Sequence, residues 1–287
     1  MAAQETWTTL KILAWTKDFL LSKDIANARL EAEWLLCAAT GLDRVGLYLQ
    51  YDKPLNESEL AAYRVLVARR ARREPLQHIL GSQEFCGLDY EVSPDVLIPR
   101  YDTELLVSEA MKRLPNARSV LDIGTGSGCI AVSLQKRLSQ AAVTATDISA
   151  GALAIARRNA EKHDAPVEFL LGSLFAPLAG RAFDLIVSNP PYIPTADIES
   201  LDLEVRNYDP RTALDGGGDG LHIYRLLIPS SVEHLNPGGW LLVEIGIGLA
   251  QDIQKLFRDS GRFSETIVAL DSAGIERVVG AQLKEIV

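Results

Sequence analysis

From residue 119 onward, short apolar stretches alternate with amphipathic stretches, and this alternation most restricts the fold that the chain can adopt. The apolar stretches are rich in β-branched residues and typical of buried parallel strands. They lie at residues 119–123, 143–147, 167–171, 183–188 and 240–245, and the amphipathic stretches lie at 127–138, 149–163, 220–235 and 249–260. Repeated strand–helix–strand units predict an α/β fold with a doubly wound parallel sheet and helices on both faces.

Two further strand-like stretches follow, at residues 263–270 and 275–280. The turn between them is short enough for the two strands to pair as a terminal antiparallel hairpin.

The first 75 residues show helical rather than strand periodicity. One amphipathic segment runs from Leu10 to Leu21, and a second begins at Ile25 and stops near Gly41, a residue suited to a helix C-cap. A third begins at Asn56, with Glu59 three residues later as a capping-box partner. No catalytic constellation occurs here, so we expect residues 1–75 to form a small all-helical domain that recognises a substrate or partner.

Residues 76–101 differ from both neighbouring regions, because Pro and Gly interrupt short strand-like pieces there. This pattern predicts a linker that contains a β-hairpin. Asp102 or Thr103 is expected to cap a new helix that begins at Glu104. The third domain then spans residues 102–287.

The chain has 287 residues, of which 47% are hydrophobic, and a formal net charge of −9. This acidic balance argues against stable nucleic-acid binding, because phosphate contacts need clustered Lys and Arg. The basic cluster at residues 69–73 is interpreted as the solvated last turn of a helix, where cations are favourable. The alternative is contact with an acidic or RNA-containing partner.

Three cysteines and four histidines are scattered along the sequence. Their spacing predicts neither a disulfide framework nor a metal site. The N-terminal residues lack the pattern of a signal peptide, and no apolar stretch approaches the length of a membrane span. We therefore expect a cytoplasmic protein without membrane contact, and a monomer.

A glycine-rich loop follows the first strand of the alternating region. It consists of Asp122, Ile123, Gly124, Thr125, Gly126, Ser127 and Gly128. Glycines let the backbone turn tightly and approach a ligand, but a dinucleotide fingerprint would place its third glycine one position later, at Cys129. Asp122 could face a cationic amino group, and Asp147 ends the second strand as a ribose-binding acid does. The combination indicates a nucleoside site and favours S-adenosylmethionine over NAD.

Ser173, Leu174 and Phe175 follow the third strand at the same edge of the sheet. Ligands of open α/β sheets bind at this carboxyl edge. Leu174 or Phe175 could pack on a purine there, or either could belong to the core between strand and helix.

The fourth strand ends in Asn189, Pro190, Pro191 and Tyr192. The two prolines donate no backbone N–H and restrict the geometry of the residues before them. The stretch therefore presents two stiffly held acceptors, the Asn189 side-chain oxygen and the Pro190 carbonyl, beside the aromatic ring of Tyr192. A planar group that carries an NH2 would fit this arrangement.

Several motifs together resemble the peptide chain release factor glutamine methyltransferases, the HemK/PrmC family. The similarity runs from about residue 74 to 251, and Leu-Ile-Pro-Arg and Asn-Pro-Pro-Tyr in one chain make it specific. The matching residues are 75–81, 84–85, 97–104, 122–128, 189–192, 210–217, 219–221 and 244–246. The resemblance implies a Rossmann-like class I methyltransferase sheet, in which a terminal hairpin is the expected addition.

The resemblance also implies an activity: transfer of methyl from S-adenosylmethionine to the side-chain amide nitrogen (N5) of the glutamine in the Gly-Gly-Gln motif of release factors. S-adenosylhomocysteine would be the product. Gly124–Gly128, Asp147, Leu174 and Asn189 would line the cofactor, with Asp122 and Ser173 as further candidates. Asn189, Pro190, Pro191 and Tyr192 would hold the glutamine, and Asn189, Pro190 and Tyr192 are the candidate catalytic residues. The family often has Pro where Tyr101 stands and Asp where Ser173 stands.

Other functions remain open from the residues. A DNA adenine-amino methyltransferase, or an RNA guanine-amino enzyme, would use Asn189–Tyr192 equally well, although the acidic charge disfavours both. A non-catalytic S-adenosylmethionine-binding adaptor would have no need of Asn189–Tyr192. A nicotinamide oxidoreductase is disfavoured by the position of the third glycine.

Overall fold

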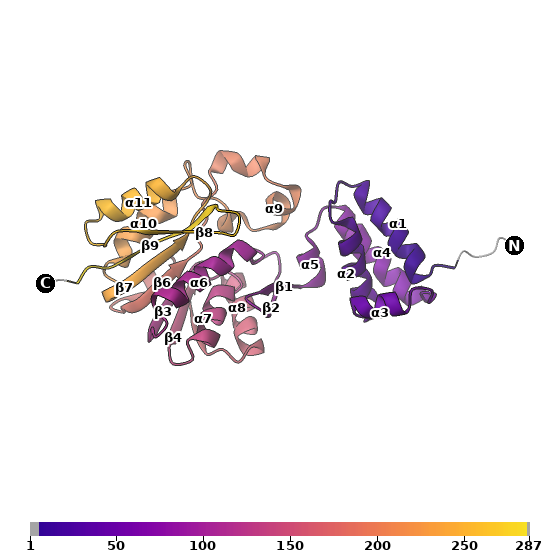
Figure 1. Cartoon of the computed structure of the whole chain (residues 1–287), viewed down its shortest axis with the longest axis horizontal. Helices are drawn as coiled ribbons and strands as arrows, with labels where there is room; N and C mark the ends of the chain where they lie inside the picture. The colour runs from indigo at the N-terminus through magenta and orange to yellow at the C-terminus, as the bar shows by residue number, and fades with distance from the viewer. Residues whose placement is uncertain (1–5, 286–287) are drawn as a thin grey trace. The chain divides into compact units, whose positions relative to one another are not determined.

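The computed structural model describes residues 6–285, and they form two compact units (Figure 1). Of the described residues, the helical unit comprises 6–81 and the separate segment Leu203–Tyr208. The sheet unit comprises Ser82–Asp202 and residues 209–285. The chain thus leaves the sheet unit after Asp202 and returns to it at Asp209.

The helical unit is built from short amphipathic helices around one apolar core. The helices are α1 (Thr9–Leu21), α2 (Ala28–Thr40), α3 (Arg44–Leu49), α4 (Glu57–Ala71), α5 (Leu76–Leu80) and α9 (Leu203–Tyr208). As predicted, Gly41 ends α2 in the left-handed conformation, at φ +71°. Asn56 and Glu59 also form the predicted capping box at the start of α4. The short helices α3 and α5 were not predicted.

The basic cluster at the end of α4 is not solvated as the sequence suggested. The Arg70 side chain is buried and forms ion pairs with Glu31 and, at 3.0 Å, with Glu204 of α9. Arg73 contacts the other Glu204 oxygen at 2.8 Å. Buried charges persist in proteins when they are paired in this way. The interpretation as an exposed last turn was wrong because the acidic partners lie 39 and 134 residues away in sequence.

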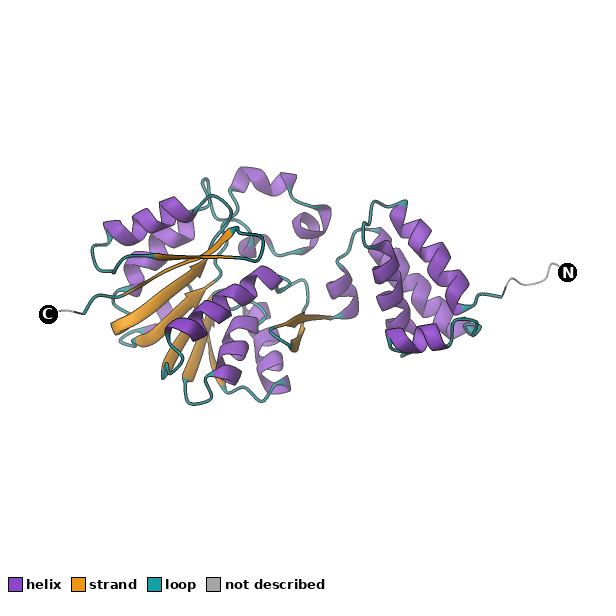
Figure 2. Cartoon of the chain, in the orientation of Figure 1, coloured by secondary structure: helices purple, strands orange, loops and turns teal. Residues whose placement is uncertain are grey.

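Among the described residues, the larger sheet of the sheet unit has seven strands in the order β5-β4-β3-β6-β7-β9-β8 (Figure 2). The strands are β3 (Ser119–Ile123), β4 (Ala142–Asp147), β5 (Val167–Leu171), β6 (Phe183–Ser188), β7 (Leu235–Glu244), β8 (Ile267–Leu270) and β9 (Glu276–Gln282). The strands from β5 to β7 are parallel, and β9 pairs antiparallel with both β7 and β8. The predicted α/β sheet with a terminal hairpin is confirmed.

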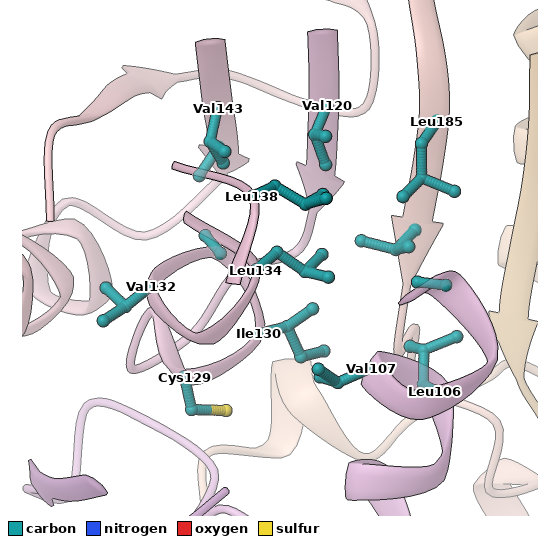
Figure 3. Packing of buried hydrophobic residues seen from close by; sticks show 14 of the residues in the cluster. Leu106, Val107, Val120, Cys129, Ile130, Val132, Leu134, Leu138, Val143 and Leu185 are labelled. Atoms are coloured by element: carbon teal, nitrogen blue, oxygen red, sulfur yellow. The ribbon is translucent and has the colours of Figure 1, made fainter. Parts of the chain in front are cut away.

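Helices cover both faces of this sheet. The principal ones are α6 (Glu104–Arg113), α7 (Cys129–Arg137), α8 (Ala150–Lys162), α10 (His222–Ser231) and α11 (Ala250–Asp259), with 3-10 turns at Tyr101–Thr103, Ala176–Leu178, Thr195–Ser200 and Arg211–Ala213. Alternate strand residues face opposite sides. Val120 and Leu185 pack with α6 and α7 (Figure 3), whereas Leu121 and Ile186 pack with α10 and α11.

Several predicted boundaries differ from the structure, three of them by four or more residues. Helix α10 ends at Ser231 rather than 235, β7 begins at Leu235 rather than 240, and β8 begins at Ile267 rather than 263. The Asn-Pro-Gly-Gly stretch at the start of β7 has turn composition, yet Leu235 pairs with Phe183 across a register shift. A strand that pairs irregularly does not show the regular alternation of apolar and polar residues by which a strand is predicted from sequence.

A β-hairpin does occur in the predicted 76–101 segment, as β1 (Ser82–Phe85) and β2 (Leu88–Glu91). Its two turn residues, Cys86 and Gly87, have φ +53° and +78°, as a type I′ turn requires. Tyr90 is fully buried, and its hydroxyl lies 2.8 Å from Ser133 Oγ on α7. The hairpin is therefore part of the core of the sheet unit. Within residues 6–285 no helix has the length and apolarity needed to span a membrane.

The Arg70 ion pairs generate a stability prediction. Glu31→Gln removes one of the two carboxylates that pair with the buried Arg70 guanidinium. It should lower the free energy of unfolding by about 2 kcal/mol. Thermal and urea unfolding followed by circular dichroism measure this change. The exposed Glu265→Gln provides the matched control and should leave the midpoint unchanged. Equal midpoints for both variants would contradict a structural role for the Glu31 pair.

Candidate functional site

A cavity of about 290 Å³ lies in the sheet unit at the carboxyl ends of β3, β4 and β6. Its walls come from the loop after β3, the end of β4, the residues after β5, the loop after β6 and the segment before α6. Parallel strands place their carboxyl ends at one edge, which is where open α/β sheets bind ligands. Most predicted site residues meet here: Gly124, Thr125, Gly126, Ser127, Asp147, Ser173, Leu174, Asn189, Pro190 and Pro191.

Asp122 lies behind the glycine loop and does not line this cavity. Its Oδ2 atom accepts hydrogen bonds from Thr125 Oγ1 at 2.6 Å and from the Ala131 amide at 3.2 Å. Burial raises the pKa of the Asp122 carboxyl to about 7. Oδ1 has no hydrogen-bond partner within the described chain. Asp122 thus stiffens the loop and keeps one acceptor atom unused.

Backbone hydrogen bonds tie the glycine loop to β4. The amides of Gly124 and Thr125 both donate to the Thr146 carbonyl, at 2.9 and 3.0 Å. Gly128 has φ +81°, and a Cβ atom there would lie 3.0 Å from Ala156 Cβ of α8. Only glycine adopts this positive φ and this close approach to α8 without strain. The loop is therefore held in one shape before any ligand arrives.

Asp147 joins this loop to the start of α8. Its Oδ2 atom accepts from the Gly126 amide at 2.9 Å, and Oδ1 accepts from the Ser149 amide at 2.8 Å. Ser149 itself caps α8 by accepting from the Ala152 amide at 3.1 Å. A carboxylate offers about four acceptor sites, so Asp147 can still bind hydroxyl groups in the cavity.

The residues after β5 separate into two roles. Leu174 lines the cavity with φ +47°, and its carbonyl accepts from the Thr146 hydroxyl at 3.3 Å. Phe175 instead is buried in the core and stacks on His234, with ring centroids 4.5 Å apart. The prediction that Phe175 could pack on a purine is wrong, because its ring fills the space between sheet and helix.

The Asn189 side chain is fixed from one end. Its Nδ2 atom donates to the Thr103 hydroxyl at 3.2 Å. Within the described residues neither Asn189 Oδ1 nor the Pro190 carbonyl accepts a hydrogen bond. Both acceptors that the sequence singled out thus keep their capacity for a ligand in the cavity that Asn189 and Pro190 line.

Tyr192 supports this loop from the side of the core. Its ring is not part of the cavity wall and packs so closely on Gly246 that a Cβ there would lie 2.9 Å from Tyr192 Cδ2. Burial raises the pKa of the Tyr192 hydroxyl to about 12. Contact between the Tyr192 ring and a bound substrate stays a prediction.

The segment before α6 contributes cavity residues that received no individual role from the sequence. Arg100 and the buried Thr103 both line the cavity, and Arg100 donates to Asp209 Oδ2 at 2.7 Å. Thr103 occupies the predicted N-cap position of α6, but its side chain makes no capping hydrogen bond. Asp102 instead pairs with Arg277 at 2.8 Å, and Thr103 accepts from Asn189. The Leu-Ile-Pro-Arg motif was the only signal for this segment.

Comparison with known proteins settles the family. A PrmC N-terminal domain matches residues 11–81, and a methyltransferase small domain matches residues 101–203. The release factor glutamine methyltransferase of Geobacter sulfurreducens is 61% identical, over 97% of this chain and 98% of the relative. The chain belongs to the release factor glutamine methyltransferases. The Koribacter versatilis member is 43% identical, over 91% of this chain and 93% of the relative.

Solved structures agree with this fold. A methyltransferase from Pyrococcus furiosus superposes with a TM-score of 0.53 at 24% identity, covering 76% of this chain and 99% of that one. The family confirms the resemblance noted in the sequence, and the chain is an S-adenosylmethionine-dependent methyltransferase. Among the described residues no group of three His, Cys, Asp or Glu side chains could hold a metal ion.

The contacts of Asp147 generate a binding prediction. Asp147→Asn replaces one acceptor oxygen by a donor, so it should loosen the glycine loop and weaken S-adenosylhomocysteine binding about tenfold. Isothermal titration calorimetry measures this affinity. Asp164→Asn, at an exposed position with φ +48° that Asn tolerates, is the control and should bind as the unaltered protein does. Unchanged affinity in Asp147→Asn would remove Asp147 from the cofactor site.

Proposed function

We propose that this chain methylates the side-chain amide nitrogen (N5) of the glutamine in the Gly-Gly-Gln motif of peptide chain release factors. Family membership supports the release factor glutamine as substrate. The observation that carries the chemistry is the pair of unused acceptors, Asn189 Oδ1 and the Pro190 carbonyl, at the wall of the cavity. An amide NH2 has two hydrogens, and this pair can accept both.

An amide nitrogen is a poor nucleophile because its lone pair is delocalised into the carbonyl group. Acceptors aimed at its two hydrogens draw electron density toward nitrogen, and they do so more strongly where water is excluded. Pro190 and Pro191 hold these acceptors stiffly, so little reorganisation is needed during the reaction. The proton that the nitrogen loses can pass to water after transfer.

S-adenosylmethionine supplies an electrophilic methyl group when bound, and the residues of the cavity fit it. Asp147 retains acceptor sites for ribose hydroxyls at the end of β4. Leu174 offers an apolar surface for a purine, and Ser173 lies beside it. Asp122 Oδ1 is buried and unpartnered behind the glycine loop, and its contact with the cationic amino group stays a prediction.

The helical unit would recognise the release factor, and the enzyme would act as a cytoplasmic monomer without stable nucleic-acid binding. The net charge of −9 supports the last point. The retained Asn189–Tyr192 sequence argues against a non-catalytic adaptor.

Methyl-labelled S-adenosylmethionine tests the proposal with three acceptors: a folded bacterial release factor, the same factor with Gln→Ala in Gly-Gly-Gln, and duplex DNA. We expect label on the first acceptor alone, and tandem mass spectrometry should place the methyl group on the glutamine N5 atom. Label on DNA alone would overturn the proposal in favour of an adenine-amino enzyme. Equal label on the Gln→Ala factor would exclude that glutamine as the target.

A further inference from the structure

Glu244 ends β7 beside the loop that begins with Asn189. Val243 of β7 pairs with Ser188 of β6 in parallel register. Glu244 and Asn189 are the residues that directly follow this pair, one on each segment. Only 3% of Glu244 is exposed, and its side chain does not line the cavity. A hydrogen bond of 2.6 Å from the Tyr224 hydroxyl to the Glu244 carbonyl holds the backbone in place.

The Glu244 carboxyl is buried among polar groups that orient it. Desolvation raises its pKa to about 7, although the Thr103 hydroxyl, the Arg277 guanidinium and the Asn189 carboxamide each favour the ionised form. Oε2 has no hydrogen-bond partner within the described chain. Arg277 is itself shared, because it pairs with Asp102 at 2.8 Å and with Asp271 at 3.0 Å.

The carboxamide of an asparagine can bind in two orientations that differ only by exchange of oxygen and nitrogen. An ionised carboxylate accepts hydrogen bonds and donates none. Asn189 donates from its NH2 group to the Thr103 hydroxyl at 3.2 Å, which leaves its oxygen for the cavity. A carboxylate beside Asn189 favours this same orientation. The reverse orientation would place Asn189 Oδ1 against a negative charge.

We infer that Glu244 is a positioning residue that fixes the orientation of the Asn189 carboxamide, so that Oδ1 faces the substrate amide. This role rests on the proposed function for its effect on catalysis. A carboxylate beside Nδ2 also polarises the Asn189 carboxamide, which makes Oδ1 a better acceptor. Glu244 acts through Asn189 and does not itself touch the substrate.

The inference has a pH dependence with a definite sign. Protonated Glu244 becomes a donor and no longer excludes the reverse orientation, so methyl transfer should rise as pH increases through about 7. The charged and titratable groups that face Glu244 are Asp102, Tyr192, Tyr224 and Arg277. Because the pKa of Glu244 is raised on folding, its ionised form opposes stability above that pH.

Glu244→Gln tests this role, because it keeps the size of the side chain and can donate as well as accept. At pH 8 we expect kcat to fall about tenfold as orientation and polarisation of Asn189 are lost. S-adenosylhomocysteine affinity should change less than about twofold, and Tm should equal or exceed that of the unaltered enzyme. The rise in kcat near pH 7 should disappear, and Glu244→Asp should restore part of the rate.

Glu109→Gln is the matched control, since Glu109 is a buried carboxylate on α6 that pairs with Lys112 and Arg113 away from Asn189. It should keep both kcat and the pH profile. An unchanged kcat and an unchanged pH profile in Glu244→Gln would overturn the inference.

A second readout needs neither substrate nor methyl transfer. The side-chain amide resonance of Asn189 in the nitrogen-15-labelled protein should shift with pH with a midpoint near 7, and this shift should vanish in Glu244→Gln. If the Asn189 resonance of the unaltered protein does not shift with pH, that result by itself overturns the inference. If the enzyme methylates no release factor while Asn189 titrates as expected, the proposed function fails and the positioning contact stands.

Discussion

The site depends on the parallel pairing of β3 with its two neighbours. Ile123 of β3 pairs with Thr146 of β4 and with Ser188 of β6, so the three strands end level with one another. The glycine loop, Asp147 and Asn189 are the next residues along these strands. A single register thus places the glycine loop, Asp147 and Asn189 around one cavity, where we propose that they bind the nucleoside, its ribose and the substrate amide. Because a shift of one residue would turn each side chain to the other face, the register also fixes the chemistry.

Buried carboxylates hold the loops that the register brings together. Asp122 binds Thr125 and the start of α7, and Glu244 lies against Asn189 and Thr103. Each carboxyl has one oxygen without a partner among the described residues, and burial raises the pKa of each to about 7. Packing alone would favour apolar residues at these positions. Their presence beside the cavity is understandable if loop shape and side-chain orientation, rather than stability, are what they provide.

The sequence predicted the parts of the fold that follow from local periodicity. Strands β3, β5 and β6 have the expected limits, and the cavity residues that directly follow strands could be named in advance. The contacts that could not be predicted join segments that lie far apart in the sequence. Thr103 lies 86 residues before Asn189, and Arg70 pairs with Glu204 at a separation of 134 residues. Phe175 could not be assigned to core or cavity, because an apolar residue after a strand suits both.

Asn189→Ala tests the central claim, that Asn189 orients the substrate amide rather than the cofactor, most directly. The measurement is the single-turnover rate of methyl transfer to a release factor, paired with the calorimetric affinity for S-adenosylhomocysteine. Loss of one acceptor in a preorganised site should reduce the rate about a hundredfold or more, while the affinity changes less than about threefold. A parallel loss of rate and affinity, or an unchanged rate, would contradict the account.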